Sequence, residues 1–236
     1  MSISDPAHVR EQYADESRLQ TRRSVWQPSA DGRDPMVEAL AAVERALPGG
    51  TGDVLDVGCG TGEQAERIAA LHGVGLKAVD FSDRFVELTA ARGVDARQAD
   101  ISYLPFDDDT FDVVYAGWML YHVRDLDRGL AEVRRVLRPG GTFVAVTNGD
   151  DHLAELRIEA GGRPAVTGFS SENGEEILSG RFGDVRRQDI ETRAVFPDHA
   201  AAQAYLDSSG EGFEGRLPHF EGEREYAGHV TVFEAR

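Results

Sequence analysis

The chain has 236 residues, 41% of them hydrophobic and 28% charged, a composition that suits one α/β domain with an ordinary core. Its 42 acidic residues outnumber 25 basic ones, and the net charge of −17 disfavours nucleic acid and anionic membranes as partners. The single cysteine, Cys59, excludes an internal disulfide. The first residues lack a signal-peptide core, and no stretch approaches the roughly 20 apolar residues of a membrane helix. We therefore expect a cytoplasmic protein.

The first 33 residues form a polar leader that contains two prominent aromatic residues, Tyr13 and Trp26. One or two short helices are expected here, and we interpret residues 1–33 as an N-terminal lid. Tyr13 is a candidate to contact a ligand from that lid. A helix then begins at Asp34-Pro35, because aspartate caps free amides and proline fits the first helical turn.

Strands and helices alternate from residue 53 onward. We expect strands over 53–57, 75–80, 94–100, 111–117 and 142–148, and helices over 63–73, 84–93 and 126–137. Alternation with short connections predicts a Rossmann-like, doubly wound α/β fold, whose parallel sheet has helices on both faces.

The remaining residues are less regular, and we expect them to complete a single domain over 1–236. Residues 149–169 are interpreted as a small cap over the acceptor site, and residues 210–227 as a loop. Helices are expected over 171–179 and from Pro197 to about Ser208, with strands over 183–191 and 226–236.

A glycine-rich turn follows the first strand, in the stretch DVLDVGCGTG. Open parallel sheets bind ligands beyond the carboxyl ends of their strands, and glycines let the backbone approach a ligand closely. Gly58, Gly60 and Gly62 depart from the dinucleotide-binding G-x-G-x-x-G pattern, because Glu63 occupies its last glycine position. A glutamate there would repel a pyrophosphate and tolerate a zwitterionic amino acid. Asp80 ends the second strand, where a carboxylate can accept hydrogen bonds from ribose hydroxyls.

The chain resembles the class I S-adenosylmethionine-dependent methyltransferases, in their small-molecule, type 11-like branch. The resemblance covers residues 53–148 and rests on VLDVGCGTG, KAVDFS, ARQADISYLPFDDDTFDVVYAGWMLYHV and RRVLRPGGTFVAVT. It implies a cofactor-binding core over this range and a sheet of seven strands, of which the last is antiparallel.

The resemblance implies S-adenosyl-L-methionine as the cofactor. The three glycines would line its amino-acid part, with Asp56 near the ammonium group. Asp80 would bind the ribose, Phe81 would lie against the adenine, and Asp100 would accept from the adenine amino group. The implied cofactor residues are Asp56, Gly58, Cys59, Gly60, Gly62, Asp80, Phe81, Ser82, Asp100, Ile101, Ala116, Gly117 and Trp118.

His122 is the candidate general base, because a neutral imidazole after the fourth strand could take a proton from an acceptor hydroxyl or amine. Alternatively, His122 packs beneath the glycine-rich turn without taking part in catalysis. Tyr121 is a second candidate for the base. No metal is expected, since the aspartates at 107–109 and 150–151 are interpreted as solvated.

The sequence favours methyl transfer to a small-molecule acceptor, through O, N or C, in natural-product metabolism. A nicotinamide-dependent oxidoreductase and a non-catalytic protein that binds the same cofactor are the alternatives. The acceptor and the oligomeric state stay open.

Overall fold

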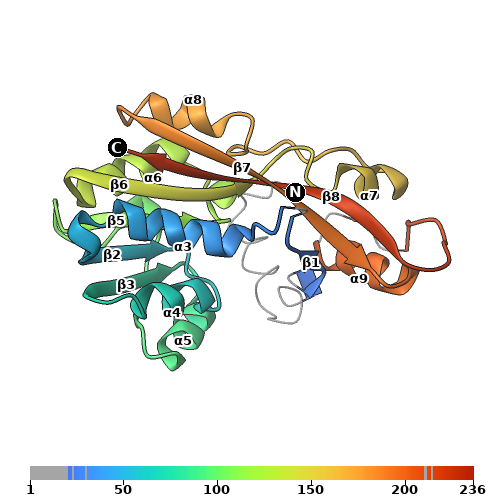
Figure 1. The fold of residues 1–236 in the computed structure, drawn as a ribbon, viewed down its shortest axis with the longest axis horizontal. Helices are drawn as coiled ribbons and strands as arrows, with labels where there is room; N and C mark the ends of the chain where they lie inside the picture. The colour runs from blue at the N-terminus through green and yellow to red at the C-terminus, as the bar shows by residue number, and fades with distance from the viewer. Residues whose placement is uncertain (1–20, 23, 30, 210–211, 214) are drawn as a thin grey trace.

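In the computed structural model, the described residues form one eight-stranded sheet with the strand order β1-β7-β8-β6-β5-β2-β3-β4 (Figure 1). The structure describes residues 21–22, 24–29, 31–209, 212–213 and 215–236. The strands are β1 (Trp26–Gln27), β2 (Gly52–Val57), β3 (Val74–Asp80), β4 (Asp95–Gln98), β5 (Phe111–Gly117), β6 (Leu137–Asn148), β7 (Val185–Phe196) and β8 (Arg224–Ala235).

Five strands, β4, β3, β2, β5 and β6, form the parallel part of the sheet. The chain runs from β2 outward to β3 and β4, then returns to the other side of β2 to form β5 and β6. The strand order therefore reverses between β2 and β5, and ligands of open α/β sheets bind at such a point. The last four residues of β2 are all buried, as expected for a central strand covered on both faces.

The fold class predicted from the sequence is confirmed, with one addition. β8 inserts between β6 and β7 and is antiparallel to both, which gives the expected antiparallel last strand. The eighth strand is β1, a two-residue strand that pairs with β7 within a leader where short helices were expected. Two residues carry too little pattern to be recognised as a strand, and only the edge of β7 defines them.

The helices cover both faces of the sheet. Val43 of α3 and Ile68 of α4 join one core cluster, and Leu130 of α6 and Leu178 of α8 join another. The cap of α3 is as predicted, because the side chain of Asp34 accepts from the amides of Met36 and Val37. The helices are α3 (Pro35–Ala46), α4 (Glu63–Ala69), α5 (Asp83–Ala91), α6 (Leu126–Val136), α7 (Ala154–Glu159), α8 (Gly174–Ser179) and α9 (His199–Ser209), with 3-10 turns η1 (Pro48–Gly50), η2 (Ile101–Tyr103) and η3 (Leu120–His122).

Strands β7 and β8 are longer than the sequence predicted, and they carry an extension of the sheet. Their pairing continues to Phe196 and Arg224, well past the point where β6 ends at Asn148. In Figure 1 this extension lies to the right, with α7, α9 and β1 around it. It has its own apolar cluster, which includes Leu156 of α7 and Leu206 of α9.

The extension corrects one boundary from the sequence. Its cluster takes side chains from places as far apart in the chain as Val25 and Tyr226, and residues 149–169, whose role as a cap stays a prediction, contribute Leu153, Leu156 and Ala160 to it. The predicted loop over 210–227 ends earlier, because β8 already begins at Arg224. Charged residues such as Arg193 interrupt the apolar pattern of β7, so its full length could not be recognised from the sequence.

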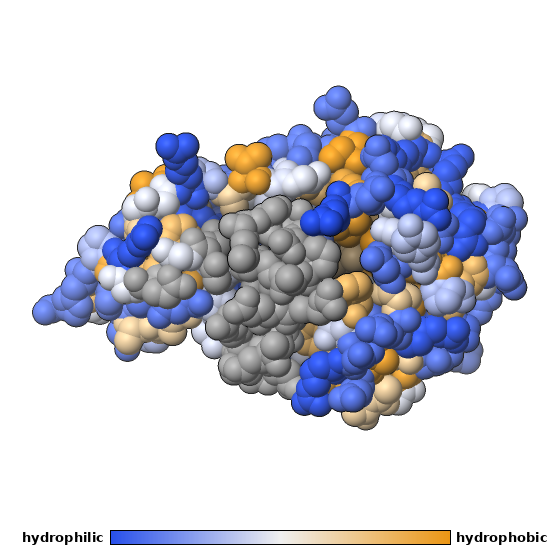
Figure 2. Space-filling view, turned by 180° about the vertical axis from the view of Figure 1, so that it is seen from behind, coloured by the Kyte–Doolittle hydropathy of each residue, from blue (hydrophilic) through white to orange (hydrophobic). Residues whose placement is uncertain are grey.

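Where Figure 2 colours the surface seen from behind, it is mostly hydrophilic, with hydrophobic residues in small separate groups. The large hydrophobic side chains that the structure describes as exposed lie on separate elements: Val37, Phe81, Tyr103, Ile158 and Val166. No described helix is long and apolar enough to cross a membrane.

Candidate functional site

The turn after β2 lies at the point where the strand order reverses. Gly58, Gly60 and Gly62 have φ angles of 75°, 56° and 79°, the left-handed region that glycine enters without steric cost. The amides of Gly58 and Cys59 donate to the carbonyl of Val79, at 2.8 and 3.1 Å. The turn is thereby attached to the end of β3.

The three glycines are needed for different reasons. A Cβ on Gly58 would lie 2.7 Å from the side chain of Met119, and one on Gly62 would lie 2.8 Å from the Cα of Thr89. A Cβ on Gly60 would meet no atom of the described residues within 4 Å. Gly58 and Gly62 therefore permit close packing within the protein, whereas Gly60 leaves an open face where a ligand can approach the backbone.

Asp80 is fixed by the same turn. Its Oδ2 accepts from the amide of Gly60 and its Oδ1 from the amide of Ser82, both at 2.9 Å. The residue is only 9% exposed, and burial raises the pKa of its carboxyl, although the amide hydrogen bonds oppose that rise. Each oxygen keeps acceptor capacity, so the carboxylate can still bind hydroxyl donors. Phe81 follows with 37% of its surface exposed.

Asp56, at the end of β2, is a buried acid whose hydrogen bonding is incomplete. It is 1% exposed, and within the described part of the chain its Oδ1 has no hydrogen-bond partner. Burial, followed by the charge of Asp80, raises its pKa to about 8. The buried Oε1 of Gln64 likewise has no partner there. Unpartnered buried acceptors are costly, and a cationic donor such as an ammonium group would satisfy them.

These observations fit the amino-acid end of S-adenosylmethionine. The open face at Gly60 gives room for a ligand, and Asp56 offers an acceptor to an ammonium group. Cys59 is buried close enough to Asp56 to be affected by its charge, and burial raises the pKa of the Cys59 thiol. A neutral, small side chain within the turn is therefore the role that the structure supports.

The predicted adenine-side residues follow β4. Asp100 is exposed, and its Oδ1 accepts from the amide of Ser102 at 2.8 Å, so it caps η2. The side chain of Ile101 is 5% exposed and belongs to the core. Only its backbone is available for the predicted contact.

The end of β5 forms a third side of this region. Ala116 is a fully buried core residue, and a Cβ on Gly117 would lie 2.2 Å from the hydroxyl of Tyr115. Trp118 has a φ of 53°, which is unusual for a bulky residue. Its backbone amide donates to Val146 at 2.8 Å, and its indole Nε1 donates to Oδ1 of Asn148 at 3.0 Å. Both partners belong to β6, so the two strand ends hold the ring in place.

His122 ends η3, just beyond Trp118. It is half-buried, and its ring lies 4.5 Å from that of Tyr121 in an edge-on arrangement. The position next to the strand ends is compatible with the predicted base role, which stays a prediction.

The N-terminal contact cannot be evaluated, because Tyr13 and most of the predicted lid lie outside the described residues. Trp26 is described, and its ring lies 4.6 Å from that of His152. His152 is 7% exposed, and its Nδ1 lies 3.1 Å from the amide of His229. Burial lowers the pKa of His152 to about 4.

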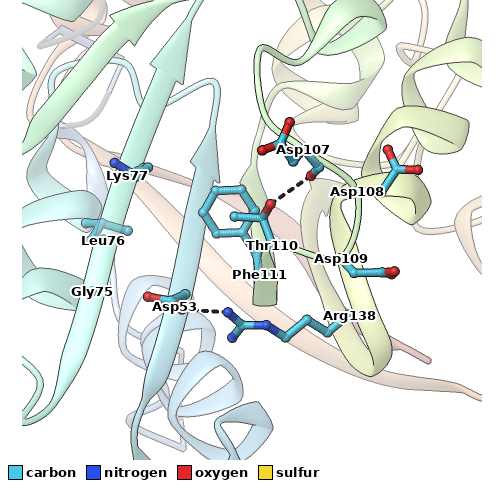
Figure 3. Close-up of a pocket in the computed structure, with 10 residues that line it drawn as sticks. All are labelled: Asp53, Gly75, Leu76, Lys77, Asp107, Asp108, Asp109, Thr110, Phe111 and Arg138. Atoms are coloured by element: carbon cyan, nitrogen blue, oxygen red, sulfur yellow. Dashed lines mark hydrogen bonds and ion pairs between the residues drawn. The ribbon is translucent and has the colours of Figure 1, made fainter.

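A cavity of about 630 Å³ lies at the amino ends of β2, β3 and β5, opposite the carboxyl ends that hold the glycine turn (Figure 3). The guanidinium of Arg138 points at Asp53 and lies 2.8 Å from its carboxylate. Part of the predicted solvated loop also lines it, where Asp108 pairs with Arg135 at 2.8 Å. The cavity is separate from the glycine turn, because the two lie at opposite ends of the strands.

The other acidic pair, at 150–151, was interpreted from the sequence as solvated, but Asp151 lies close to other side chains. Asp151 is 3.0 Å from Nδ1 of His229, whose Nε2 is 3.3 Å from Asp189. Atoms of Asp151, Glu172 and His229 lie within 4.8 Å of one another. The expectation of no metal stays a prediction.

The sequence did not identify several residues of this region. Thr89, Arg92 and Asn148 contact the turn or the predicted sulfonium wall from other elements. None belongs to the motifs that carried the resemblance. A pattern of neighbouring residues gives no signal for such contacts, since the partners are distant along the chain.

Comparison with known proteins agrees with this geometry. Residues 55–145, from β2 to β6, match the family model described as a methyltransferase domain. The chain is 31% identical over 140 residues to the mitochondrial arginine-hydroxylase NDUFAF5 of Mus musculus, a match that covers 55% of the chain and 41% of that protein. It is 36% identical over 116 residues to the O-methyltransferase rstn1 of Aspergillus nomiae, a match that covers 46% of the chain and 48% of that protein.

The chain thus spans less than half of the length of these relatives. Among solved structures, the [4+2]-cyclase SpnF superposes with a TM-score of 0.63 at 17% identity, over 100% of this chain and 97% of that one. This likeness shows the fold alone.

Fold, turn and comparisons together support a class I S-adenosylmethionine-dependent methyltransferase domain, to whose family model residues 55–145 are similar, as the sequence resemblance implied.

Proposed function

We propose that the protein is an S-adenosylmethionine-dependent methyltransferase that acts on a small-molecule acceptor. The observation that carries this proposal is the buried Oδ1 of Asp56, which has no partner among the described residues, together with the face of Gly60 that those residues leave open. A site of this kind needs a ligand with a cationic donor, and the amino-acid end of the cofactor has one.

The cofactor supplies an electrophilic methyl group on a sulfonium. The residues of the chain would bind and orient it: Asp56 the ammonium group, Asp80 the ribose, and Phe81 the adenine. Trp118, fixed by Asn148, would form an aromatic wall near the cationic sulfur, a favourable cation–π arrangement. Alignment and exclusion of water are the main requirements of such a transfer.

His122 would accept the proton of an acceptor hydroxyl or amine. A carbon acceptor that is already activated would not need this base. The named relatives include an O-methyltransferase and a hydroxylase, so the target atom is not fixed by similarity.

A small acceptor is supported by the net charge of −17, which opposes association with nucleic acid. A role in natural-product metabolism and a cytoplasmic location belong to the same proposal. The alternatives are a nicotinamide-dependent oxidoreductase and a non-catalytic protein that binds the same cofactor. Glu63 at the head of α4 disfavours the first, since it would face a pyrophosphate.

The test is calorimetric titration of protein freed of bound ligand with S-adenosylmethionine, S-adenosylhomocysteine and NADH. Binding of the first two without NADH is the expected result, and an acceptor screen with radiolabelled methyl donor follows. Binding of NADH alone would overturn the proposal. Cofactor binding without turnover of any acceptor would favour the non-catalytic alternative.

A further inference from the structure

We propose that Thr89 and Arg92, at the C-terminal end of α5, are positioning residues for the cofactor. They hold the peptide groups of the glycine turn in the orientation that binds the amino-acid end of S-adenosylmethionine. The inference rests on the proposed function, since it takes this turn as the cofactor site.

Thr89 holds the first of these peptide groups. The residue is completely buried, and its hydroxyl oxygen lies 3.1 Å from the carbonyl oxygen of Gly60 and 3.3 Å from Sγ of Cys59. The hydroxyl has one proton, and the carbonyl is the stronger acceptor. In a trans peptide the C=O and the following N–H point in opposite directions. With the Gly60 carbonyl directed at α5, the amide of Thr61 is therefore turned away from α5.

Arg92 holds the second peptide group. Its Nε donates to the carbonyl oxygen of Thr61 at 2.7 Å. The same guanidinium is 2.6 Å from the carboxylate of Glu66 and 3.9 Å from that of Glu63, both on α4. These two contacts restrict its rotation, so the Nε donor stays directed at the turn.

Because α5 packs closely against the turn, the hydrogen bonds of Thr89 and Arg92 can control the orientation of its peptide groups. A Cβ on Gly62 would lie 2.8 Å from the Cα of Thr89, so backbone meets backbone with no side chain between them. Removal of the Thr89 hydroxyl would leave the part-buried Gly60 carbonyl without this hydrogen bond. That loss favours rotation of the peptide plane, because a carbonyl that loses its donor away from water is costly.

The experiment measures binding of two probes to the full chain by calorimetry. S-adenosylhomocysteine has both the amino-acid and the nucleoside part, whereas 5′-methylthioadenosine has only the nucleoside part. Thr89→Val keeps the side-chain volume and removes the hydroxyl. It is expected to weaken S-adenosylhomocysteine binding about three- to tenfold and to leave 5′-methylthioadenosine binding unchanged. Thr89→Ser should restore wild-type affinity.

Arg92→Ala provides a second, more exposed variant with the same expected selectivity, and it keeps the inference testable if Thr89→Val folds poorly. Arg84→Ala is the matched control, because it removes an exposed ion pair to Glu87 from the same helix. Thermal melting verifies that each variant is folded.

Two results would overturn the inference alone: wild-type affinity of Thr89→Val and Arg92→Ala for S-adenosylhomocysteine, or an equal loss of affinity for both probes. The equal loss would mean general loosening of the site. A wild-type protein that binds NADH in place of S-adenosylhomocysteine would overturn the proposed function as well.

Discussion

The carboxylate of Asp80 accepts a hydrogen bond from the glycine turn, since its Oδ2 lies 2.9 Å from the amide nitrogen of Gly60. The residue expected to bind the ribose therefore also fixes the conformation of the turn. Its second oxygen accepts from Ser82, so both of its oxygens already contribute to the fold.

Replacement of Asp80 by alanine should accordingly affect binding and stability together. Loss of charged hydrogen bonds is expected to weaken binding of S-adenosylmethionine by about 1–3 kcal/mol. The melting temperature should also fall, because two backbone amides lose their acceptor. Calorimetry and circular dichroism measure the two effects. Unchanged cofactor affinity would contradict the ribose assignment.

Asp56 should make the stability of the ligand-free protein depend on pH. Its pKa is raised to about 8 in the fold, so between the unfolded value and pH 8 the folded state binds more protons than the unfolded state. Stability from this group is complete at low pH and is lost as pH rises toward 8. Asp56→Asn removes the titration.

The measurement is urea unfolding of both proteins from pH 5 to pH 9. The stability of Asp56→Asn relative to wild type should increase with pH and level off above pH 8. A difference that does not change with pH would mean that Asp56 ionises normally. A control in which S-adenosylhomocysteine is present should flatten the difference, since the ligand would pair with the ionised acid.

Gly60→Ala should separate cofactor binding from folding. Gly60 has a φ of 56° and open space around its Cα, so alanine costs only about 1 kcal/mol of stability through backbone strain. The added methyl group would occupy the face where the ligand approaches, and affinity for S-adenosylhomocysteine should fall at least tenfold.

Gly49→Ala is the matched control for this variant, because Gly49 has a φ of 64° and equally open space away from the turn. It should lose similar stability and keep full affinity. Gly62→Ala should unfold the protein more severely than either, since its Cβ would strike the backbone of Thr89. Normal binding by Gly60→Ala would place the ligand elsewhere.

His122→Ala should slow methyl transfer to a hydroxyl or amine acceptor about 10²- to 10⁴-fold, the usual effect of losing a general base. Affinity for S-adenosylhomocysteine should not change. Steady-state kinetics with an acceptor from the screen, together with calorimetry, test both statements. Tyr121→Phe is the comparison variant, because Tyr121 is the other candidate and its ring contacts His122. Full activity of His122→Ala would remove the residue from the mechanism.

His152 should destabilise the protein at mildly acidic pH. Burial lowers its pKa to about 4, so the unfolded state binds a proton near pH 6.5 that the folded state does not. Stability is therefore lost as pH falls from about 6.5 toward 4.

His152→Asn keeps an acceptor for the amide of His229 and removes the titration. Urea unfolding between pH 4 and 7.5 should show the variant gaining stability relative to wild type as pH falls. Parallel stability curves would mean that the imidazole of His152 becomes protonated within the fold.

The parallel core was predictable because its signals are local. Each strand and helix between residues 53 and 148 has its own periodicity, and Gly58 and Asp80 stand at the strand ends that the pattern defines. The long antiparallel pair was not predictable to the same degree. The full length of β7 is fixed by its register with β8, and β1 exists as a strand only through pairing with Ala194.

The site divides in a similar way. The sequence alone determined the fold class and the end of the strands that holds the turn, because those features follow from the order and spacing of neighbouring residues, and the resemblance of its motifs to a known family implied the cofactor. Tertiary structure decided that, among the residues described, Gly60 is open while Gly62 is packed, and that Oδ1 of Asp56 has no partner. Burial and hydrogen bonding depend on residues that are distant along the chain, such as Thr89, and no local pattern encodes those contacts.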